Sequence, residues 1–238
     1  MTALQENIAR IEEQIVAACR AAGRFRSEVE LMAVSKTYPA VTLAEAASLG
    51  LHLFGENRVQ EYAAKSVELE PLRLLGEHRV HLIGHLQSNK ALRAVELFDG
   101  IDTVDSLRLA QRLNEAAGNS GKQLPILIEV KLSHEESKAG LDPTSAVTAE
   151  LLERLPDLPH LQMQGLMTIA PFDVPEDETR ACFRSLRTWR DRWAAACPRL
   201  AFDVLSMGMS GDFPLAIAEG ATRIRVGTSL FGRRPRKL

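Results

Sequence analysis

The chain has 238 residues, which suits either one large α/β domain or two small ones, and 45% of them are hydrophobic, enough for a sizeable core. Its 29 Lys and Arg residues against 31 Asp and Glu residues give a formal net charge of -2, which argues against a nucleic-acid-binding surface. Three cysteines without metal-ligand spacing, Cys19, Cys182 and Cys197, argue against a disulfide framework and a zinc site. Because no signal peptide and no apolar run of membrane-spanning length is found, we expect a cytoplasmic protein.

An amphipathic helix is predicted first, over residues 2–22, where Leu4, Ile8, Ile11 and Ile15 recur at helical spacing and Gly23 follows as a stop. Eight short runs then have the pattern of strands, at residues 31–36, 51–54, 80–84, 100–104, 125–130, 161–169, 202–206 and 222–226. Helical patterns separate them, at residues 41–49, 58–69, 87–98, 106–117, 143–155, 176–196 and a short stretch ending at 219.

This unbroken alternation of strands and helices predicts a parallel sheet. No Pro/Gly/Ser linker or composition shift divides the chain, so we expect a single domain spanning residues 1–238. Eight such units in this length favour a closed (β/α)8 TIM barrel, with the first helix as an addition, over an open doubly wound sheet.

The first strand, Leu31-Met-Ala-Val-Ser-Lys36, ends in a lysine before Pro39. Side chains alternate along a strand, so Met32, Val34 and Lys36 share one face, and Lys36 lies above an apolar floor. Such a partly desolvated amine has a lowered pKa and is suited to forming a Schiff base with an aldehyde. The alternative is a solvated lysine at a strand end.

Two loops at the ends of the seventh and eighth predicted strands have the composition of an anion site. Ser206-Met-Gly208-Met-Ser210 and Gly227-Thr228-Ser229 combine hydroxyl groups with glycines that let backbone amides approach an oxyanion. Either loop alone could be a simple turn. In a barrel, however, phosphates bind after strands seven and eight, and strand eight neighbours strand one.

An amine beside a phosphate site predicts pyridoxal 5'-phosphate (PLP) as the ligand, because PLP is a phosphate-bearing aldehyde that condenses with lysine. Arg225, two residues before Gly227, can then reach the ring nitrogen if its side chain points inward. Asn57 lies where a strand gives way to a helix, so it can serve as an N-cap, as a ligand, or as both.

A series of motifs along the whole chain resembles the pyridoxal phosphate homeostasis family, also called the proline synthetase co-transcribed homologues. The motifs are Val34-Ser-Lys36-Thr, Phe54-Gly-Glu-Asn57-Arg-Val-Gln-Glu61, His81-Leu-Ile-Gly84-His-Leu-Gln87, Gly165-Leu-Met167-Thr, Leu205-Ser-Met-Gly-Met-Ser210 and Ile224-Arg-Val-Gly227-Thr-Ser-Leu-Phe-Gly232. This family is similar in fold to the N-terminal barrel of alanine racemase.

The resemblance implies a set of cofactor-binding positions. It implies a Schiff base on Lys36, phosphate contacts from Ser206, Gly208, Gly227 and Thr228, Arg225 at the pyridine nitrogen, and Asn57 beside the cofactor. Met167, Met207 and Ser210, which lie within the same motifs, complete the predicted set.

Arg223 departs from the expected pattern. It has the same strand parity as Arg225, so both should point into the barrel, with Arg223 one layer deeper. A buried arginine needs a partner, and we expect Glu129 on the fifth strand to provide it. Alternatively, a local bulge breaks the parity, which would leave open which arginine meets the ring.

The predicted site favours only weak catalysis. Arg225 can only donate a hydrogen bond to an unprotonated pyridine, which is a poor electron sink, so racemisation is the one realistic enzymatic option. Two-base racemisation needs an acid/base opposite Lys36, which barrel racemases take from a partner subunit with an extra C-terminal domain, and no such domain is expected here. Of the two tyrosines, Tyr38 lies near enough to Lys36 in the sequence to be considered as this acid/base, and Tyr62 does not.

His81, His85 and His134 have no recognisable orienting partner in the sequence, so none is predicted to act as the second base. Lys138 is a second amine, either a solvated loop residue or an acceptor of the aldehyde during transfer.

We therefore expect a PLP-binding protein that serves cellular PLP supply without robust catalysis and without a metal. The alternatives are a low-activity amino-acid racemase or lyase, and an RNA- or partner-binding barrel that uses the basic tail at residues 233–237. Expected partners are PLP and apo PLP enzymes, with no nucleic acid, no membrane and a monomeric state.

Overall fold

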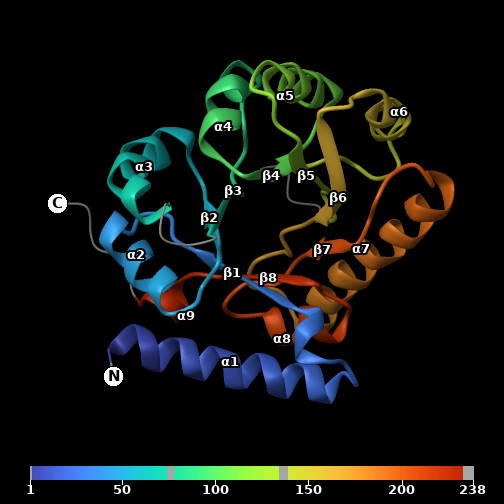
Figure 1. Cartoon of the computed structure of the whole chain (residues 1–238). Helices are drawn as coiled ribbons and strands as arrows, with labels where there is room; N and C mark the ends of the chain where they lie inside the picture. The colour runs from blue at the N-terminus through green and yellow to red at the C-terminus, as the bar shows by residue number, and fades with distance from the viewer. Residues whose placement is uncertain (1, 74–77, 134–138, 233–238) are drawn as a thin grey trace.

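A computed structural model describes residues 2–73, 78–133 and 139–232 of the chain. Its first helix, α1 (Ala3–Ala21), begins at Thr2, whose side chain accepts a hydrogen bond from the backbone amide of Gln5. One face of α1 buries Leu4, Ile11, Ile15 and Cys19, as the periodicity predicts. Figure 1 shows α1 lying across the outside of the barrel beside α8 (Phe213–Ala218) and α9 (Thr228–Phe231).

Eight parallel strands form a closed barrel in sequence order, with the first strand paired to the last (Figure 1). The strands are β1 (Glu30–Val34), β2 (Leu53–Glu56), β3 (Arg79–Leu82), β4 (Gly100–Val104), β5 (Leu124–Glu129), β6 (Leu161–Met167), β7 (Val204–Ser206) and β8 (Arg223–Val226). The predicted (β/α)8 barrel is confirmed, and the open doubly wound alternative is wrong.

Helices follow the strands and surround the barrel (Figure 1). Besides α1, α8 and α9 they are α2 (Ala40–Ser48), α3 (Val59–Arg73), α4 (Ala91–Leu97), α5 (Leu107–Asn119), α6 (Ala146–Arg154) and α7 (Glu176–Ala196). Short 3-10 turns occur at Arg26–Glu28, Ser88–Lys90 and Leu155–Asp157. None of the helices in the described ranges combines the length and apolar character needed to cross a bilayer.

Most predicted boundaries agree with the structure to within two residues, and the differences have local causes. Helix α5 begins after Ser106, whose hydroxyl accepts the amide hydrogen of Leu109. Helix α6 begins after Ser145, whose hydroxyl accepts the amide hydrogen of Thr148. Because Ser145 is the cap, α6 starts later than the predicted residue 143. Helix α3 continues to Arg73, whereas the pattern predicts an end near residue 69.

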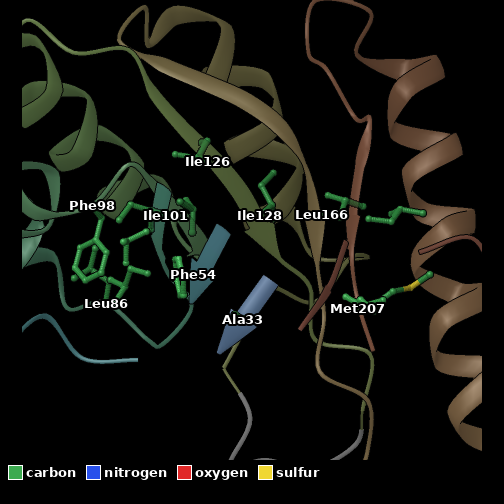
Figure 2. Close-up of a cluster of buried hydrophobic side chains, with 14 of the residues drawn as sticks. Ala33, Phe54, Leu86, Phe98, Ile101, Ile126, Ile128, Leu166 and Met207 are labelled. Atoms are coloured by element: carbon green, nitrogen blue, oxygen red, sulfur yellow. The ribbon is translucent and has the colours of Figure 1, made fainter. Parts of the chain in front are cut away.

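Alternation along the strands divides the core into two layers. Ala33, Phe54, Ile126, Ile128 and Leu166 point away from the barrel axis and pack with side chains from the helices (Figure 2). The opposite faces point inward, where a second cluster of buried side chains consists of Met32, Val34, Leu53 and Ile83. Met32 and Val34 therefore form the apolar floor that the sequence predicts beneath Lys36.

Candidate functional site

A cavity of about 370 Å³ lies at the carboxyl ends of the strands. Six predicted site residues line it, namely Lys36, Asn57, Ser210, Arg225, Gly227 and Thr228. They come from the ends of β1, β2, β7 and β8 or from the loops that follow. This is the end of a parallel barrel at which ligands bind, and the volume lies in the range of small-molecule sites.

Lys36 lies in the turn after β1, two residues beyond the end of the strand, and its side chain is half-buried beside Val34. Both peptide groups that flank it are held from α3. The Ser35 carbonyl accepts a 3.1 Å hydrogen bond from Lys65 Nζ, and the Thr37 amide donates to Glu61 Oε1. Thr37 adopts a left-handed backbone conformation, with φ of 72°, which a β-branched residue rarely adopts. Helix α3 thus fixes a strained turn that carries the lysine.

The residues that hold this turn form a buried ionic cluster. Lys65 Nζ lies 3.0 Å from Glu56 Oε1 and 3.2 Å from Glu61 Oε1. The Ser35 hydroxyl donates to the same Glu56 oxygen at 2.8 Å. Burial raises the pKa of Glu56, although the positive charge of Lys65 opposes the shift. The carboxyl group of Glu56 therefore depends on Lys65 to remain ionised.

Arg225 is buried, and its guanidinium is anchored on one side. Nη1 donates to the Ser206 carbonyl at 2.7 Å and to the Ser206 hydroxyl at 2.9 Å, and Nη2 donates to the Thr168 carbonyl at 2.8 Å. These bonds use three of the five N–H donors of an arginine and leave two for a ligand in the cavity. Burial lowers the pKa of Arg225, while Asp102, Asp212 and Glu129 oppose that shift.

Arg223 points inward one layer deeper, as the parity predicts, but the prediction that Glu129 is its partner is wrong. Its Nε lies 2.8 Å from Glu30 Oε2, and its Nη1 lies 3.3 Å from Asp102 Oδ2. Residues 30–33 pair with residues 223–226 in unbroken register, so the bulge alternative is also wrong. Glu129 instead lies at the carboxyl end of β5, at the height of the cavity, because the strands of a barrel are staggered.

The two glycine-containing loops present unused donors at the cavity. Within the described part of the chain, the backbone amides of Ser210, Gly211 and Thr228 have no hydrogen-bond acceptor. The loops are tied together by a 3.3 Å bond from the Gly227 amide to the Ser210 hydroxyl. A Cβ atom at Gly227 would lie 3.2 Å from the Val34 carbonyl oxygen, so a side chain there would crowd β1. Free amides and hydroxyls in this arrangement suit an anion.

Four of the predicted site residues do not line the cavity. Ser206 is fully buried and bonded to Arg225, and Met207 packs in the outer hydrophobic core (Figure 2). Gly208 accepts the Arg225 amide hydrogen at 2.9 Å, and a Cβ atom there would lie 2.5 Å from the Cβ of Ala216. Met167 is buried at the end of β6. The structure gives these residues supporting positions behind the cavity wall.

Asn57 lines the cavity from the segment between β2 and α3. Helix α3 begins at Val59, which places Asn57 one residue before the cap position. A Cβ atom at Gly84 would lie 2.1 Å from the Asn57 carbonyl oxygen. Only a glycine at residue 84 therefore allows this approach of the segment after β3 to Asn57.

Comparison with known proteins identifies the family. The family model for the N-terminal domain of alanine racemase matches residues 2–235. The pyridoxal phosphate homeostasis protein of Vibrio cholerae serotype O1 is 41% identical to this chain, with 98% of each chain covered. The chain belongs to the pyridoxal phosphate homeostasis family. The family resemblance carried by the sequence motifs is thereby confirmed.

Solved structures of similar proteins have the same fold. PipY of Synechococcus elongatus PCC7942 is 44% identical, and the match covers 96% of this chain and 100% of PipY. Its TM-score is 0.86 for the structure without PLP and 0.84 for the structure with PLP bound. Alanine racemase of Clostridium difficile 630 has a TM-score of 0.75 at 16% identity, over 98% of this chain and 57% of that one, which shows the shared fold alone.

The cavity of this homeostasis-family chain also has walls outside the predicted set of cofactor-binding residues. They are contributed by Tyr38, Ile83, Ile169, Phe172 and Met209. Ile169 and Phe172 follow β6 in a segment without a motif, so no local signal could have found them. Tyr38, by contrast, follows Lys36 closely enough to be suspected, and its hydroxyl donates to the Gly232 carbonyl at 2.6 Å.

The structure describes two of the three histidines that the sequence offered as a possible second base. His81 is buried and its Nδ1 lies 2.8 Å from Asp102 Oδ1, which gives it a place deep in the barrel beside Arg223. His85 forms an exposed ion pair with Asp105, at 3.1 Å. His134, Lys138 and the basic tail lie outside the described residues.

Proposed function

We propose that this chain holds PLP in the 370 Å³ cavity, as a Schiff base on Lys36, and hands it on to other proteins without robust catalysis of its own. One observation carries the proposal. Lys36, Arg225 and the two loops with unused amides line a single cavity. Each of these features alone is common in proteins, whereas together they match the aldehyde, the ring nitrogen and the phosphate of PLP. PipY, a relative in the same family, has been solved with PLP bound.

The residues of the cavity fit this cofactor. The amides of Ser210, Gly211 and Thr228 and the hydroxyls of Ser210 and Thr228 would hold the phosphate. Each charge-assisted hydrogen bond contributes on the order of 1.5–3 kcal/mol, so several of them make a tight anion site. Lys36 would supply the amine that forms the Schiff base.

Arg225 would set the electronic character of the bound cofactor. One of its two remaining N–H donors can donate a hydrogen bond to the pyridine nitrogen, and an arginine keeps its proton at ordinary pH. Ser206 and Thr168 hold the guanidinium so that it cannot turn away. The cofactor would therefore supply an electrophilic carbon but only a weak electron sink. This argues for storage and transfer over carbanion chemistry.

Tyr38 is the tyrosine on the cavity wall, and its hydroxyl is bonded to the Gly232 carbonyl. Tyr62 is fully buried against Phe98, with ring centroids 4.9 Å apart. Neither position offers a ready acid/base for a two-base racemisation. The competing proposal, a slow amino-acid racemase, therefore has less support than a carrier.

The test begins with an absorbance spectrum of the protein incubated with PLP. We expect a band near the violet edge that borohydride removes, and a single modified peptide that contains Lys36. The Lys36→Ala variant should show neither. A label on Lys65, with Lys36 unmodified, would sink the proposed linkage.

A second experiment separates the carrier from the racemase. The loaded protein is incubated with a panel of L-amino acids, and chirality and products are followed. We expect turnover well below the usual range of roughly 1–10³ per second. Turnover within that range, lost in Lys36→Ala, would establish an enzyme instead.

A further inference from the structure

A second cavity, of about 250 Å³, adjoins the first at the mouth of the barrel. Asn57, Ile83 and Ile169 line both cavities, so a small molecule in one contacts walls of the other. The remaining walls of the second cavity come from the ends of β3 and β5 and the chain beyond them, and they include Glu129 and Ser133. The proposed function makes no use of these two residues.

Glu129 and Ser133 are the unusual members of this wall. Glu129 is only 5% exposed and Ser133 only 9%. Within the described part of the chain, Glu129 Oε2 and Ser133 Oγ have no hydrogen-bond partner. Leaving a buried polar atom without a partner costs about 1–3 kcal/mol, and more for a charged group. Both residues line the same cavity, so a ligand there toward which these side chains turn would supply the missing partners.

The backbone around Glu129 keeps its side chain in place. The Leu141 amide donates to the Glu129 carbonyl at 2.8 Å, and the Lys131 amide donates to the Leu141 carbonyl at 2.9 Å. Gly140 passes so close that a Cβ atom there would lie 3.2 Å from the Glu129 Cγ. The carboxyl group is thus packed from behind and cannot easily leave the cavity.

Several charges surround this carboxyl group. Asp105 lies near it from the end of β4 and is paired with His85 at 3.1 Å, while Arg225 approaches from β8 and Lys131 lines the same cavity. Burial, aided by Asp105, raises the pKa of Glu129 to about 7, against the opposing charges of Arg225 and His85. Near neutral pH the group can both accept and release a proton.

We infer that Glu129 and Ser133 form a subsite for the ammonium group of a small primary amine, placed beside the cofactor cavity. This inference rests on the proposed function. An ammonium group has three N–H donors and no acceptor, which matches a carboxylate oxygen and a hydroxyl oxygen that receive no hydrogen bond from the described residues. Its positive charge also compensates the buried carboxylate. A volume of about 250 Å³ favours a small free amine over a lysine side chain that is attached to a protein.

The subsite gives the carrier a way to release its cargo. An ammonium ion must lose a proton before its nitrogen can attack a carbon, and Glu129 is placed to accept that proton. When the amine replaces Lys36, one carbon–nitrogen bond forms and the bond to Lys36 Nζ breaks. The two protons that remain on the incoming nitrogen move to Nζ as the double bond is exchanged, and the proton held by Glu129 follows, so Lys36 leaves as an ammonium group and atoms and charge balance.

The first experiment compares two nucleophiles on the PLP-loaded protein at neutral pH. Ethylamine is an ammonium ion at this pH, whereas methoxyamine is neutral and needs no proton acceptor. We expect Glu129→Gln to slow displacement from Lys36 by ethylamine roughly 10²-fold and to leave the methoxyamine rate unchanged. Ser133→Ala should slow ethylamine displacement less. Equal slowing of both nucleophiles, or of neither, overturns the inference.

Two further measurements support this comparison. In the unaltered protein, the ethylamine rate should rise with pH as Glu129 ionises and level off above about pH 7, whereas amine deprotonation alone would make it rise further. The methoxyamine rate should show no such dependence on Glu129. A lysine-containing peptide tests the other source of amine, and its rate should not depend on Glu129. Dependence on Glu129 for the peptide alone would contradict the size argument.

A cofactor-free measurement separates this inference from the proposed function. Calorimetric titration of the unloaded protein with ethylammonium should show binding that Glu129→Gln abolishes, and methoxyamine should not bind. If the protein never forms a Schiff base on Lys36, the proposed function fails while this titration still decides the subsite. Ethylammonium binding that survives Glu129→Gln would place the amine elsewhere.

Discussion

The hydroxyl oxygen of Ser206 lies 2.9 Å from the guanidinium nitrogen Nη1 of Arg225, and both side chains are buried. Ser206 therefore supports the arginine at the cavity, although its sequence context had indicated a phosphate ligand. Ser210, four residues later, lines the cavity and accepts the Gly227 amide hydrogen. Two serines in one loop thus have different roles, and substitution can separate them.

Replacing each serine by alanine should change a different property. Ser206→Ala removes a buried hydrogen bond to a charged group and should lower the free energy of unfolding by about 1.5–3 kcal/mol. Ser210→Ala should leave stability nearly unchanged but weaken PLP binding. Urea unfolding and equilibrium titration measure the two effects. As a control, Ser210→Ala should not change the binding of pyridoxal, which lacks the phosphate, and equal weakening for both vitamers would contradict the assigned role.

A methyl group at Gly84 should damage the site through the backbone. The added Cβ atom would meet the Asn57 carbonyl oxygen at 2.1 Å, so the segment after β3 and the Asn57 segment must separate. Overpacking of this kind typically costs about 1–3 kcal/mol, and more where backbone must shift. We expect Gly84→Ala to lower both stability and PLP affinity. Gly211→Ala is the matched control for stability, since a Cβ atom there has nothing within 4 Å.

The ionic cluster that holds the Lys36 turn against α3 should show strong coupling. Lys65→Met leaves the fully buried Glu56 without its cation, and breaking a buried pair in this way costs about 3–5 kcal/mol. The loss should shrink at acid pH, where Glu56 takes up a proton. The double variant Glu56→Gln/Lys65→Met should regain part of the stability in urea unfolding. Additive losses in the double variant would show that the two side chains are not coupled.

Glu129 should make stability depend on pH. Its pKa is about 7 in the folded chain against an ordinary value of 4.5, so between these values the folded state retains a proton that the unfolded state has lost. Stability from this group therefore falls as pH rises, by roughly 3 kcal/mol across the interval. The Glu129→Gln variant has no titrating group at this position, so it lacks this pH-dependent contribution to stability. Its unfolding free energy, relative to the unaltered protein, should rise by that amount from acid to neutral pH, and a constant difference would contradict the buried, unpaired position.

The sequence alone determined the barrel and the centre of the site. Strand and helix patterns are local, because side chains alternate with a period of two along a strand and recur at 3.6 residues along a helix, and eight alternating units leave few ways to close a parallel sheet. The same local parity placed Met32 and Val34 beneath Lys36, and Arg223 one layer below Arg225. Six cavity-lining residues were therefore among the predicted set.

Only the tertiary structure decided which residues meet across the barrel. Arg223 contacts Glu30 and Asp102 because β1 pairs with β8 in register while the β4–β5 and β5–β6 pairings each shift register. Those shifts and the stagger of the strands are collective properties of the closed sheet, and no short stretch of sequence encodes them. For the same reason Ser206 lies behind Arg225 while Ser210 faces the cavity, and Glu129 reaches a second cavity, where no residue that the structure describes bonds its Oε2 atom.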